Sequence, residues 1–398
     1  MKGRREFLAA AAGLLAMREA RAQSTPGLRK DGAGGPAPDA SRTAELEERI
    51  RRVLTPVRDQ HHLPGLVGAL VHGDAPALVG AVGLRKIGAS EPFRPGDRVH
   101  LGSCTKAMTA TVVASVVEEG KLTWDSTTSK VFPELARAVH PDFRPATLWD
   151  FLTHRAGLPH DGPWWQLGRG KTTTQQRRVL LTRMLSQAPL SRPGTKYEYS
   201  NVGYALAGLM AEHVTGRSWE DLMRRRLFEP LGMTTAGFGV PGVGTKVDEP
   251  WGHRGAPGDV RPVRADNAPA LGPAGTVHAS ISDWAKFAAL HVQAARGKPR
   301  LLQAATFRKL QTPSKGSDYA GGWYIGERSW AGGTTLMHKG SNTSWYCSVW
   351  LAPARDLAVL VASNQGDGPV DAACDEATEA LLRLETGSRQ AAARRRRR

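Results

Sequence analysis

The spacing of apolar positions changes along the chain and predicts segments of different kinds. Residues 65–86, "GLVGALVHGDAPALVGAVGLRK", contain two apolar runs that meet at Gly73 and Asp74, which predicts two strands joined as a hairpin. The preceding segment from Ala44 to Leu54 has helical spacing. From Ser103 to about residue 260 the pattern is mainly helical, interrupted by turns rich in glycine and proline.

Beyond about residue 320 the chain favours strands, and residues 371–385 then predict a closing helix. Strands at both ends with a helical insert favour the α+β class: one antiparallel sheet built from both ends of the chain, covered by helices, beside a helical lobe. We expect a functional site in the cleft between the two lobes. The four strand-like segments are "GGWYIGERSW" (321–330), "GTTLMHKG" (333–340), "SWYCSVWLAP" (344–353) and "DLAVLVASN" (356–364).

These patterns divide the chain into parts with different expected roles. Residues 41–115 and 260–385 are predicted to form the sheet lobe with its covering helices, and residues 116–259 the helical lobe. Residues 23–40 are rich in glycine and proline without periodicity, which indicates a disordered linker. Residues 386–398 end in a run of arginines and are predicted to be a disordered polybasic tail.

The first 22 residues have the features of an export signal. A basic start is followed by an apolar stretch from Phe7 to Met17 and by a small-x-small end at Ala20–Ala22. The pair Arg4-Arg5, followed by Glu6, Phe7 and Leu8, fits the twin-arginine type, with an ordinary Sec signal as the alternative. The apolar stretch is too short to span a bilayer. We therefore expect a periplasmic or secreted protein.

The charge of the chain adds little to this picture. Its 398 residues carry a net charge of +17, part of which lies in the leader and in the terminal run Arg394–Arg398. No nucleic-acid recognition motif accompanies the charge, so we expect no nucleic-acid partner. The arginine tail favours weak contact with anionic lipid or cell-wall polymer, and we expect a monomer.

Three cysteines form an odd set for an oxidising compartment. Cys104 lies beside apolar residues and is expected to be a small buried filler, whereas a bridge between Cys347 and Cys374 stays open. No grouping of cysteine and histidine has the spacing of zinc ligands, and we expect no metal or cofactor.

The segment "HLGSCTKAMTATVVASVVEEGKL" holds the first candidate chemistry. Ser103 and Lys106 open an apolar helix that ends at Glu118–Gly120, and positions i and i+3 share one helix face. A serine becomes a nucleophile only when a base takes its proton, and a desolvated lysine can serve as that base or lower the pKa of a third group. The alternative is that Ser103 caps the helix and Lys106 is solvated.

Two later segments offer partners for this serine. In "YEYSN", a phenol near an ammonium would be shifted toward phenolate, so Tyr199 is a candidate general base, while Asn201 could hold Lys106 or bind a substrate carbonyl. The alternative is that Tyr199 packs and Asn201 caps the following helix. In "LMHKGSN", the glycine of the string His338-Lys339-Gly340 allows close approach to a strand edge. The N–H groups of Ser103 and Ser341 are then candidates for an oxyanion hole.

Ser-x-x-Lys, Tyr-x-Asn and a basic-x-Gly strand occur here in the order seen in a known superfamily. The sequence resembles class C β-lactamases and D-alanyl-D-alanine carboxypeptidases, whose superfamily also contains esterases. The resemblance implies a β-lactamase/transpeptidase-like fold, with a central antiparallel sheet flanked by helices and an all-helical lobe. Further similar segments are "LTHRAGLP" (152–159), "LFEPLGMTTAGFG" (227–239) and "GPAGTVHASISDWAKF" (272–287).

The resemblance also implies roles for single residues. Ser103 takes the place of the nucleophile, Lys106 that of its proton partner, and Tyr199 that of general base and then acid. Asn201 orients the substrate. His338 occupies the position where class C lactamases carry lysine and some carboxypeptidases and esterases carry histidine.

Two departures from the family pattern bear on the substrate. Lys339 stands where lactamases and carboxypeptidases usually carry a hydroxyl that helps to bind the substrate carboxylate, and Gly340 fixes this register. After the "GLP" turn, His160 and Asp161 stand where class C lactamases carry a glutamine that contacts the substrate amide. Efficient lactam hydrolysis is therefore not expected, whereas the acylating residues are all present.

The sequence thus predicts an exported serine hydrolase that cleaves an amide or ester through an acyl-enzyme on Ser103. Its substrate is a D-Ala-D-Ala peptide, an ester or, as an alternative, a β-lactam. A non-catalytic sensor that binds cell-wall peptides or penicillin is a rival of another class, but it would be expected to have lost catalytic residues. A polybasic adhesion protein is a second rival, supported only by the tail.

Overall fold

The amino-terminal hairpin is built into a sheet made mostly of carboxy-terminal strands. The computed structural model describes residues 40–396. Strand β1 (Gly65–His72) pairs antiparallel with β2 (Leu78–Gly83) and with β11 (Leu357–Ser363). The sheet order is β2-β1-β11-β10-β9-β8, so the prediction of one antiparallel sheet drawn from both ends of the chain is confirmed. The remaining strands of this sheet are β8 (Tyr324–Arg328), β9 (Gly333–Ser341) and β10 (Tyr346–Ala352).

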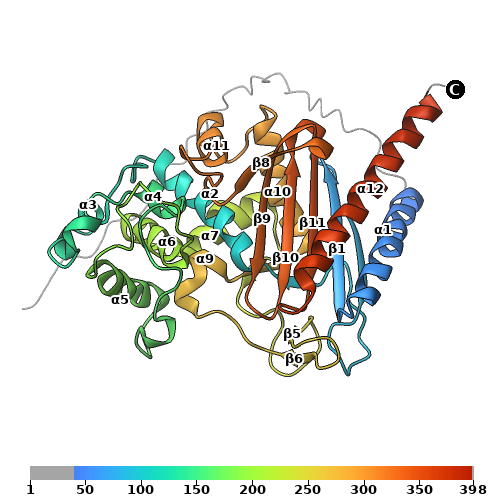
Figure 1. The fold of residues 1–398 in the computed structure, drawn as a ribbon, viewed down its shortest axis with the longest axis horizontal. Helices are drawn as coiled ribbons and strands as arrows, with labels where there is room; N and C mark the ends of the chain where they lie inside the picture. The colour runs from blue at the N-terminus through green and yellow to red at the C-terminus, as the bar shows by residue number, and fades with distance from the viewer. Residues whose placement is uncertain (1–39, 397–398) are drawn as a thin grey trace, which may run out of the picture. The chain divides into compact units, whose positions relative to one another are not determined.

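Alternate residues of β1 enter two different cores. Val67 packs into the larger core, on the side of α10 (Ile281–Ala295), whereas its neighbour Leu66 packs into a core formed with α1 (Ala40–Gln60) and α12 (Val370–Arg396). This period of two is that of a strand buried on both faces. Figure 1 shows α1 and α12 lying side by side over one face of the sheet.

The middle of the chain supplies a group of helices packed around α2 (Thr105–Glu118). This helix is buried on nearly all sides and packs on α6 (Asn201–Thr215). The side chain of Ser200 caps α6, which ends at Gly216 in the left-handed conformation that glycine favours. The other helices are α3 (Thr128–Val131), α4 (Leu148–Leu152), α5 (Thr173–Leu185), α7 (Trp219–Met223), α8 (Glu229–Leu231), α9 (Gly272–Gly275) and α11 (Ala304–Gln311).

Two small sheets were not predicted from the sequence. Strand β7 (Val277–Ser280) pairs with β3 (Arg98–His100) and β4 (Gly237–Phe238), and β5 (Gly252–Arg254) pairs with β6 (Arg261–Val263). Strands of two to four residues contain too few alternations of apolar and polar positions to be recognised by periodicity.

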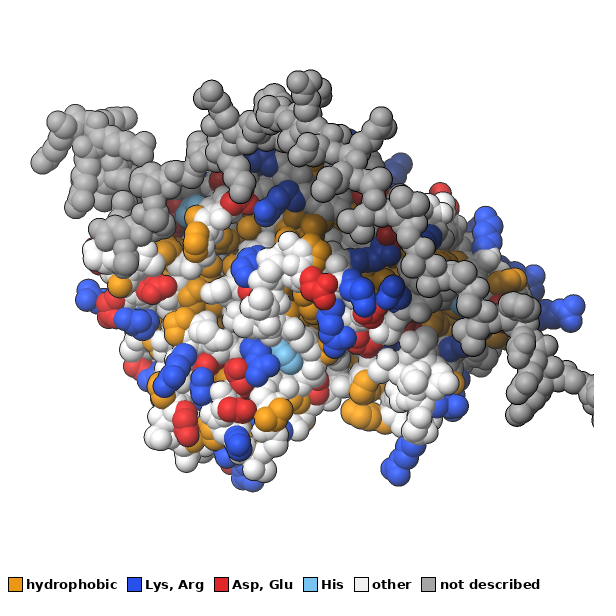
Figure 2. All heavy atoms as spheres, turned by 180° about the vertical axis from the view of Figure 1, so that it is seen from behind, with side chains coloured by type: hydrophobic (Ala, Val, Ile, Leu, Met, Phe, Trp, Pro, Cys, Tyr) orange, Lys and Arg blue, Asp and Glu red, His pale blue; other side chains and the backbone are white. Residues whose placement is uncertain are grey.

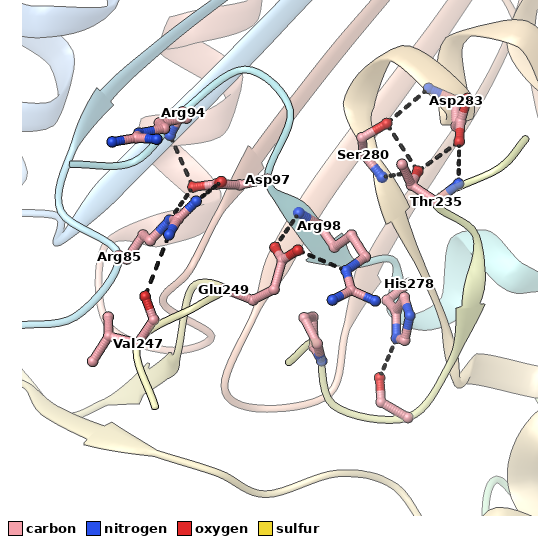
Figure 3. A network of polar contacts seen from close by, with 12 residues as sticks. Arg85, Arg94, Asp97, Arg98, Thr235, Val247, Glu249, His278, Ser280 and Asp283 are labelled. Carbon is pink, nitrogen blue, oxygen red and sulfur yellow. Dashed lines mark hydrogen bonds and ion pairs between the residues drawn. The ribbon is translucent and has the colours of Figure 1, made fainter. Parts of the chain in front are cut away.

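Ion pairs fix β3, which leads directly into the segment that carries Ser103. The carboxylate of Glu249 accepts hydrogen bonds from the backbone N–H and the guanidinium of Arg98, at 2.9 and 2.8 Å. The nearly buried carboxylate of Asp97 pairs with Arg85 in the same network (Figure 3). These contacts anchor the strand that delivers the candidate nucleophile.

The carboxy-terminal helix is longer than predicted. Helix α12 continues to Arg396, so the prediction of a disordered tail over 386–398 is wrong for residues 386–396, whose backbone is helical. The predicted export signal (1–22) and residues 23–39 of the predicted linker lie outside the described residues, and Ala40 already belongs to α1. Within residues 40–396, no helix combines the length and apolar character that a membrane span requires.

The three cysteines are all buried and all free thiols. The predicted alternative of a bridge between Cys347 and Cys374 is therefore not realised. The sulfur of Cys347 instead lies 3.6 Å from that of Cys104, whose burial agrees with its expected role as a filler.

Charged side chains of both signs are mixed on the surface. On the face turned away from the viewer in Figure 1, lysine and arginine side chains are interspersed with acidic and apolar ones (Figure 2).

Candidate active site

Ser103 lies in a short 3₁₀ turn, Gly102–Cys104, between β3 and α2. Its side chain does not cap α2, so the alternative role of a helix cap is excluded. Gly102 has a φ of +45°, and a Cβ on it would lie 2.4 Å from the backbone nitrogen of Ser341. The N–H of Gly102 donates to Nδ1 of the buried His100, at 3.1 Å. The turn is therefore held against the end of β9 with Ser103 facing a cleft.

The amine of Lys106 is completely buried and lies 3.0 Å from Ser103 Oγ. It also donates to Asn201 Oδ1, at 2.8 Å, and to the backbone oxygen of Ala274, at 2.9 Å. Burial lowers the pKa of Lys106 from 10.5 to about 7, although the charge of Asp161 opposes the shift. Two acceptors use both N–H bonds of a neutral amine, which leaves its lone pair for the Ser103 hydroxyl.

Asn201 connects this lysine to a second polar pair. It is the first residue of α6, whose cap is Ser200, so the alternative role of Asn201 as the cap is excluded. Its Nδ2 donates to Asp161 Oδ1, at 2.9 Å, and Asp161 Oδ2 lies 2.6 Å from Nδ1 of His160. The amide thus joins Lys106 to Asp161, with its oxygen toward the amine and its nitrogen toward the carboxylate.

Tyr199 lies beside the side chain of Ser103, and its ring lies 4.8 Å from Nζ of Lys106. The prediction that a nearby ammonium shifts this phenol toward phenolate is wrong. Burial raises the pKa of Tyr199, outweighing the opposing effect of the Ser103 hydroxyl. A lysine with a pKa of about 7 is also only partly charged at neutral pH. Tyr199 is therefore a neutral phenol beside the serine, whereas much of Lys106 is already in its basic, neutral form at neutral pH.

His338 lines a second pocket together with Tyr199, and among the described residues it forms no hydrogen bond with Ser103 or Lys106. Its Nδ1 lies 2.6 Å from the backbone oxygen of Lys339, and its Nε2 lies 3.2 Å from the hydroxyl of Tyr319. Burial, followed by the charge of Lys106, lowers the pKa of His338 to about 3. The imidazole is therefore neutral and belongs to a packed group of aromatic rings.

Lys339 does not point into the site, contrary to the reasoning from the family pattern. Its amine lies 2.6 Å from Asp371 and 3.0 Å from Asp375, both on α12 at the opposite face of the sheet. Because successive residues of a strand point to opposite faces, His338 and Gly340 face the site side while Lys339 faces the helix. Lys339 therefore cannot occupy the place of a substrate-binding hydroxyl.

Gly340 lets the turn that carries Ser103 pack against β9 more closely than a residue with a Cβ would allow. A Cβ at this position would lie 2.1 Å from the backbone oxygen of Leu101 and 3.0 Å from the backbone nitrogen of Ser103. The glycine thus lets the edge of β9 pack directly on the nucleophile turn. This contact brings the backbone of Ser341 beside that of Ser103, as the predicted oxyanion hole requires, and both residues line the cleft.

The cleft has a volume of about 520 Å³ and is lined by both polar and aromatic side chains. Trp165 is 77% exposed at its edge. The residues around Ser103 are His160, Asp161, Trp164, Trp165, Asn201, Arg254, Ala265, Asp266, Asn267, Ala268, Leu271, Ala274, Gly275, Ser341, Asn342 and Thr343. Within residues 40–396, no group of three or more histidine, cysteine, aspartate or glutamate side chains is arranged to hold a metal ion.

Sequence reasoning missed two supporting residues. Asp266 lies 2.8 Å from Nε2 of His100, which in turn accepts from the nucleophile turn. His154 is buried under Tyr199, at 4.3 Å between ring centroids, and its Nδ1 accepts from the backbone N–H of Ser200. The motif "LTHRAGLP" marked the second residue, whereas nothing near Asp266 in the sequence indicated the first.

A protein-family model described as Beta-lactamase matches residues 50–383. The chain therefore belongs to this family of serine hydrolases with the β-lactamase/transpeptidase-like fold, as the sequence resemblance indicated.

Particular relatives carry different names. Penicillin-binding protein 4 of Amycolatopsis lactamdurans is 28% identical over 323 residues, which cover 78% of this chain and 83% of the relative. Unguisins hydrolase ungD' of Aspergillus campestris (strain IBT 28561) is 25% identical over 335 residues, 80% of this chain but only 62% of the relative. The structure of D-amino acid amidase from Ochrobactrum anthropi SV3 superposes with a TM-score of 0.69 at 20% identity, over 87% of this chain and 99% of that chain. This last likeness concerns the fold.

Proposed function

We propose that the protein is an exported serine hydrolase that cleaves an amide or ester through an acyl-enzyme on Ser103, of the D-alanyl-D-alanine carboxypeptidase or esterase type. The observation that carries this proposal is the buried amine of Lys106, 3.0 Å from Ser103 Oγ and with a pKa lowered to about 7. A base of this pKa is partly neutral at physiological pH, as proton transfer from a serine requires.

In the proposed acylation, neutral Lys106 accepts the proton of Ser103 while Oγ attacks the carbonyl carbon of the substrate. The N–H groups of Ser103 and Ser341 stabilise the negative charge that develops on the carbonyl oxygen. Tyr199, a neutral phenol beside Ser103, passes a proton to the departing amine or alcohol and regains one from Lys106. Asn201 keeps the amine of Lys106 in place throughout.

The substrate class rests on the cleft and on the relatives. A cleft with exposed tryptophan, arginine and carboxylate side chains suits a peptide-like or acyl substrate with polar groups. The printed names of the relatives include a penicillin-binding protein, a hydrolase and an amidase, all compatible with cleavage of an acyl bond. A β-lactamase activity is the second candidate, and the family membership favours it. Export by the twin-arginine route and a periplasmic or secreted location are part of the proposal and rest on the first 22 residues.

A hydrolysis panel tests the proposal directly. The purified protein is assayed on short-chain p-nitrophenyl esters, D-Ala-D-Ala peptides and a chromogenic cephalosporin, and a fluorophosphonate or labelled penicillin is mapped by peptide mass spectrometry. We expect turnover of at least one class and a label on Ser103 that is absent from Ser103→Ala. A label on another serine would refute the assignment of the nucleophile. Binding of penicillin without turnover of any substrate would favour the non-catalytic sensor.

A further inference from the structure

His160 and Asp161 form a pair at the mouth of the cleft that the proposed acylation does not use. Nδ1 of His160 lies 2.6 Å from Oδ2 of Asp161, and both residues line the same cleft as Ser103. The side chain of His160 is 63% exposed, so the histidine is open to solvent and to a bound substrate.

Asp161 is fixed as a carboxylate. Its other oxygen accepts from Nδ2 of Asn201, at 2.9 Å, and from Nε1 of Trp164, at 3.0 Å. Partial burial raises the pKa of Asp161, but the hydrogen bonds from Asn201, Trp164 and His160 outweigh burial and leave the pKa below its usual range. A carboxylate only accepts, so Nδ1 of His160 must donate, and the lone pair of the neutral imidazole is on Nε2.

The position of His160 is also fixed, although its side chain is exposed. Its ring stacks on the ring of Tyr199, with centroids 5.5 Å apart and an angle of 29° between the planes. Its backbone oxygen accepts from the N–H of Asn201, at 2.8 Å. Tyr199 in turn lies beside Ser103, so the imidazole is stacked on a neighbour of the nucleophile.

We propose that His160, oriented by Asp161, is a catalytic residue: the general base that activates water for hydrolysis of the acyl-enzyme. The inference rests on the proposed function, since it requires an acyl group on Ser103. An aspartate that holds a histidine in one tautomer is a recurrent arrangement for such a base. Lys106 and Tyr199 serve the proposed acylation, so the two half-reactions use different bases.

The step balances in protons and bonds. His160 Nε2 takes one proton from water, and the oxygen of that water forms a bond to the acyl carbon. The tetrahedral intermediate then breaks its bond to Ser103 Oγ and releases the carboxylic acid. The imidazolium of His160 gives the proton it took from water to the departing Ser103 Oγ, which restores the serine hydroxyl and the neutral imidazole.

The test separates the two half-reactions on p-nitrophenyl acetate. Stopped-flow release of p-nitrophenol measures the burst, which reports acylation, and the following steady state reports deacylation. The variants are His160→Gln and, as a matched control, His140→Gln, because His140 also faces an aspartate (Asp142, at 3.8 Å) but does not line the cleft. We expect His160→Gln to keep the burst rate within about twofold, to slow the steady state about 10²-fold, and to accumulate acetyl-Ser103 by mass spectrometry. His140→Gln should behave as the unaltered protein.

A pH profile of the deacylation rate distinguishes a general base from a structural residue, because loss of a structural residue would not change the shape of the profile. The deacylation rate of the unaltered protein should rise with pH, as a reaction that needs a general base does, and this rise should be absent in His160→Gln. The other titratable side chains that line the cleft are Asp161, Asp266 and Arg254, while Tyr199 stacks on His160 and Lys106 contacts Ser103. Equal loss of burst and steady state in His160→Gln, or a normal steady state, would overturn the role of His160 while leaving the acyl-enzyme intact. Absence of any acyl-enzyme in the unaltered protein would refute the proposed function itself.

Discussion

Lys106 lies 3.0 Å from Ser103, with its two other hydrogen bonds directed to Asn201 and to the backbone of Ala274. This arrangement accommodates a neutral amine, because each of the two acceptors takes one N–H and the lone pair faces the serine. In the proposed acylation, the rate therefore depends on the protonation of Lys106 rather than on that of Tyr199.

The first prediction concerns pH. Because burial lowers the pKa of Lys106 to about 7, the amine is protonated below that pH and neutral above it. Only the neutral amine accepts the serine proton, so kcat/KM on a short ester should fall about tenfold per pH unit below about 7 and level off above it. Initial rates across the pH range, with the substrate's own hydrolysis subtracted, provide the measurement. A profile that is flat through pH 7 would contradict the assignment of Lys106 as the base.

The second prediction tests whether Lys106 and Tyr199 act as a unit. Lys106→Ala and Tyr199→Phe should each lower kcat/KM by about 10²-fold or more, because each loses one partner in proton transfer to or from Ser103. Since both residues serve the same step, the double variant should be little worse than the poorer single variant. Losses that multiply fully in the double variant would show two independent roles.

The third prediction follows from the orientation of Lys339. Its amine pairs with Asp371 and Asp375 on α12, away from the cleft. Lys339→Met should leave kcat/KM unchanged within about twofold and lower the free energy of unfolding by less than about 1 kcal/mol, because the three side chains are partly exposed. Urea unfolding and ester kinetics on the same preparation give both numbers. A large loss of activity without a loss of stability would place Lys339 in substrate binding after all.

The fourth prediction concerns a buried ion pair behind the site. The guanidinium of Arg177 is fully buried and pairs with Glu212 and Glu220, both at 2.6 Å, while it donates to the backbone oxygens of Pro269 and Ala270. Arg177→Met leaves the buried Glu212 without its cation and should cost about 3–5 kcal/mol of the free energy of unfolding.

The neighbouring residue supplies the matched control for this change. Arg178 pairs with Glu134 at the surface, and its side chain is 41% exposed. Arg178→Met should therefore cost no more than about 1 kcal/mol in the same unfolding experiment. Equal costs for the two variants would mean that burial does not determine the contribution of Arg177.

The fifth prediction concerns the substrate. We expect a higher kcat/KM on short acyl esters than on a chromogenic cephalosporin, with a burst and then slow turnover on the latter. Lys339 is directed away from the cleft and does not affect this preference. The expected preference for esters follows from His160 and Asp161, which line the cleft where the family resemblance places a lactam-binding amide. Misplacement of the acyl group by about 1 Å can slow hydrolysis about 10²-fold. A kcat/KM near about 10⁶ M⁻¹s⁻¹ on the cephalosporin would identify an efficient lactamase instead.

Much of the architecture could be predicted from the sequence because the long strands and helices carry regular apolar spacing. The hairpin at Gly73 and Asp74 and the helix after Ser103 are examples, since burial of each depends on a local period of apolar residues. The candidate residues Ser103, Lys106, Tyr199 and His338 could likewise be named from the sequence, because each lies in a short local motif and the motifs occur in the order of the family that the sequence resembles.

The tertiary structure decided the properties that depend on neighbours distant in the chain. The pKa of Lys106 and that of Tyr199 are set mainly by burial, which reversed the predicted shift of the phenol. The partners of Lys339 are aspartates of α12 that lie 32 and 36 residues further along the chain, and only the fold brings them together. Asp161 likewise bonds to Asn201, 40 residues away in the sequence, only because the fold brings the two segments together. Desolvation and pairing arise only when separate segments meet, so a linear pattern names the reacting groups but does not give their protonation states or the faces on which they lie.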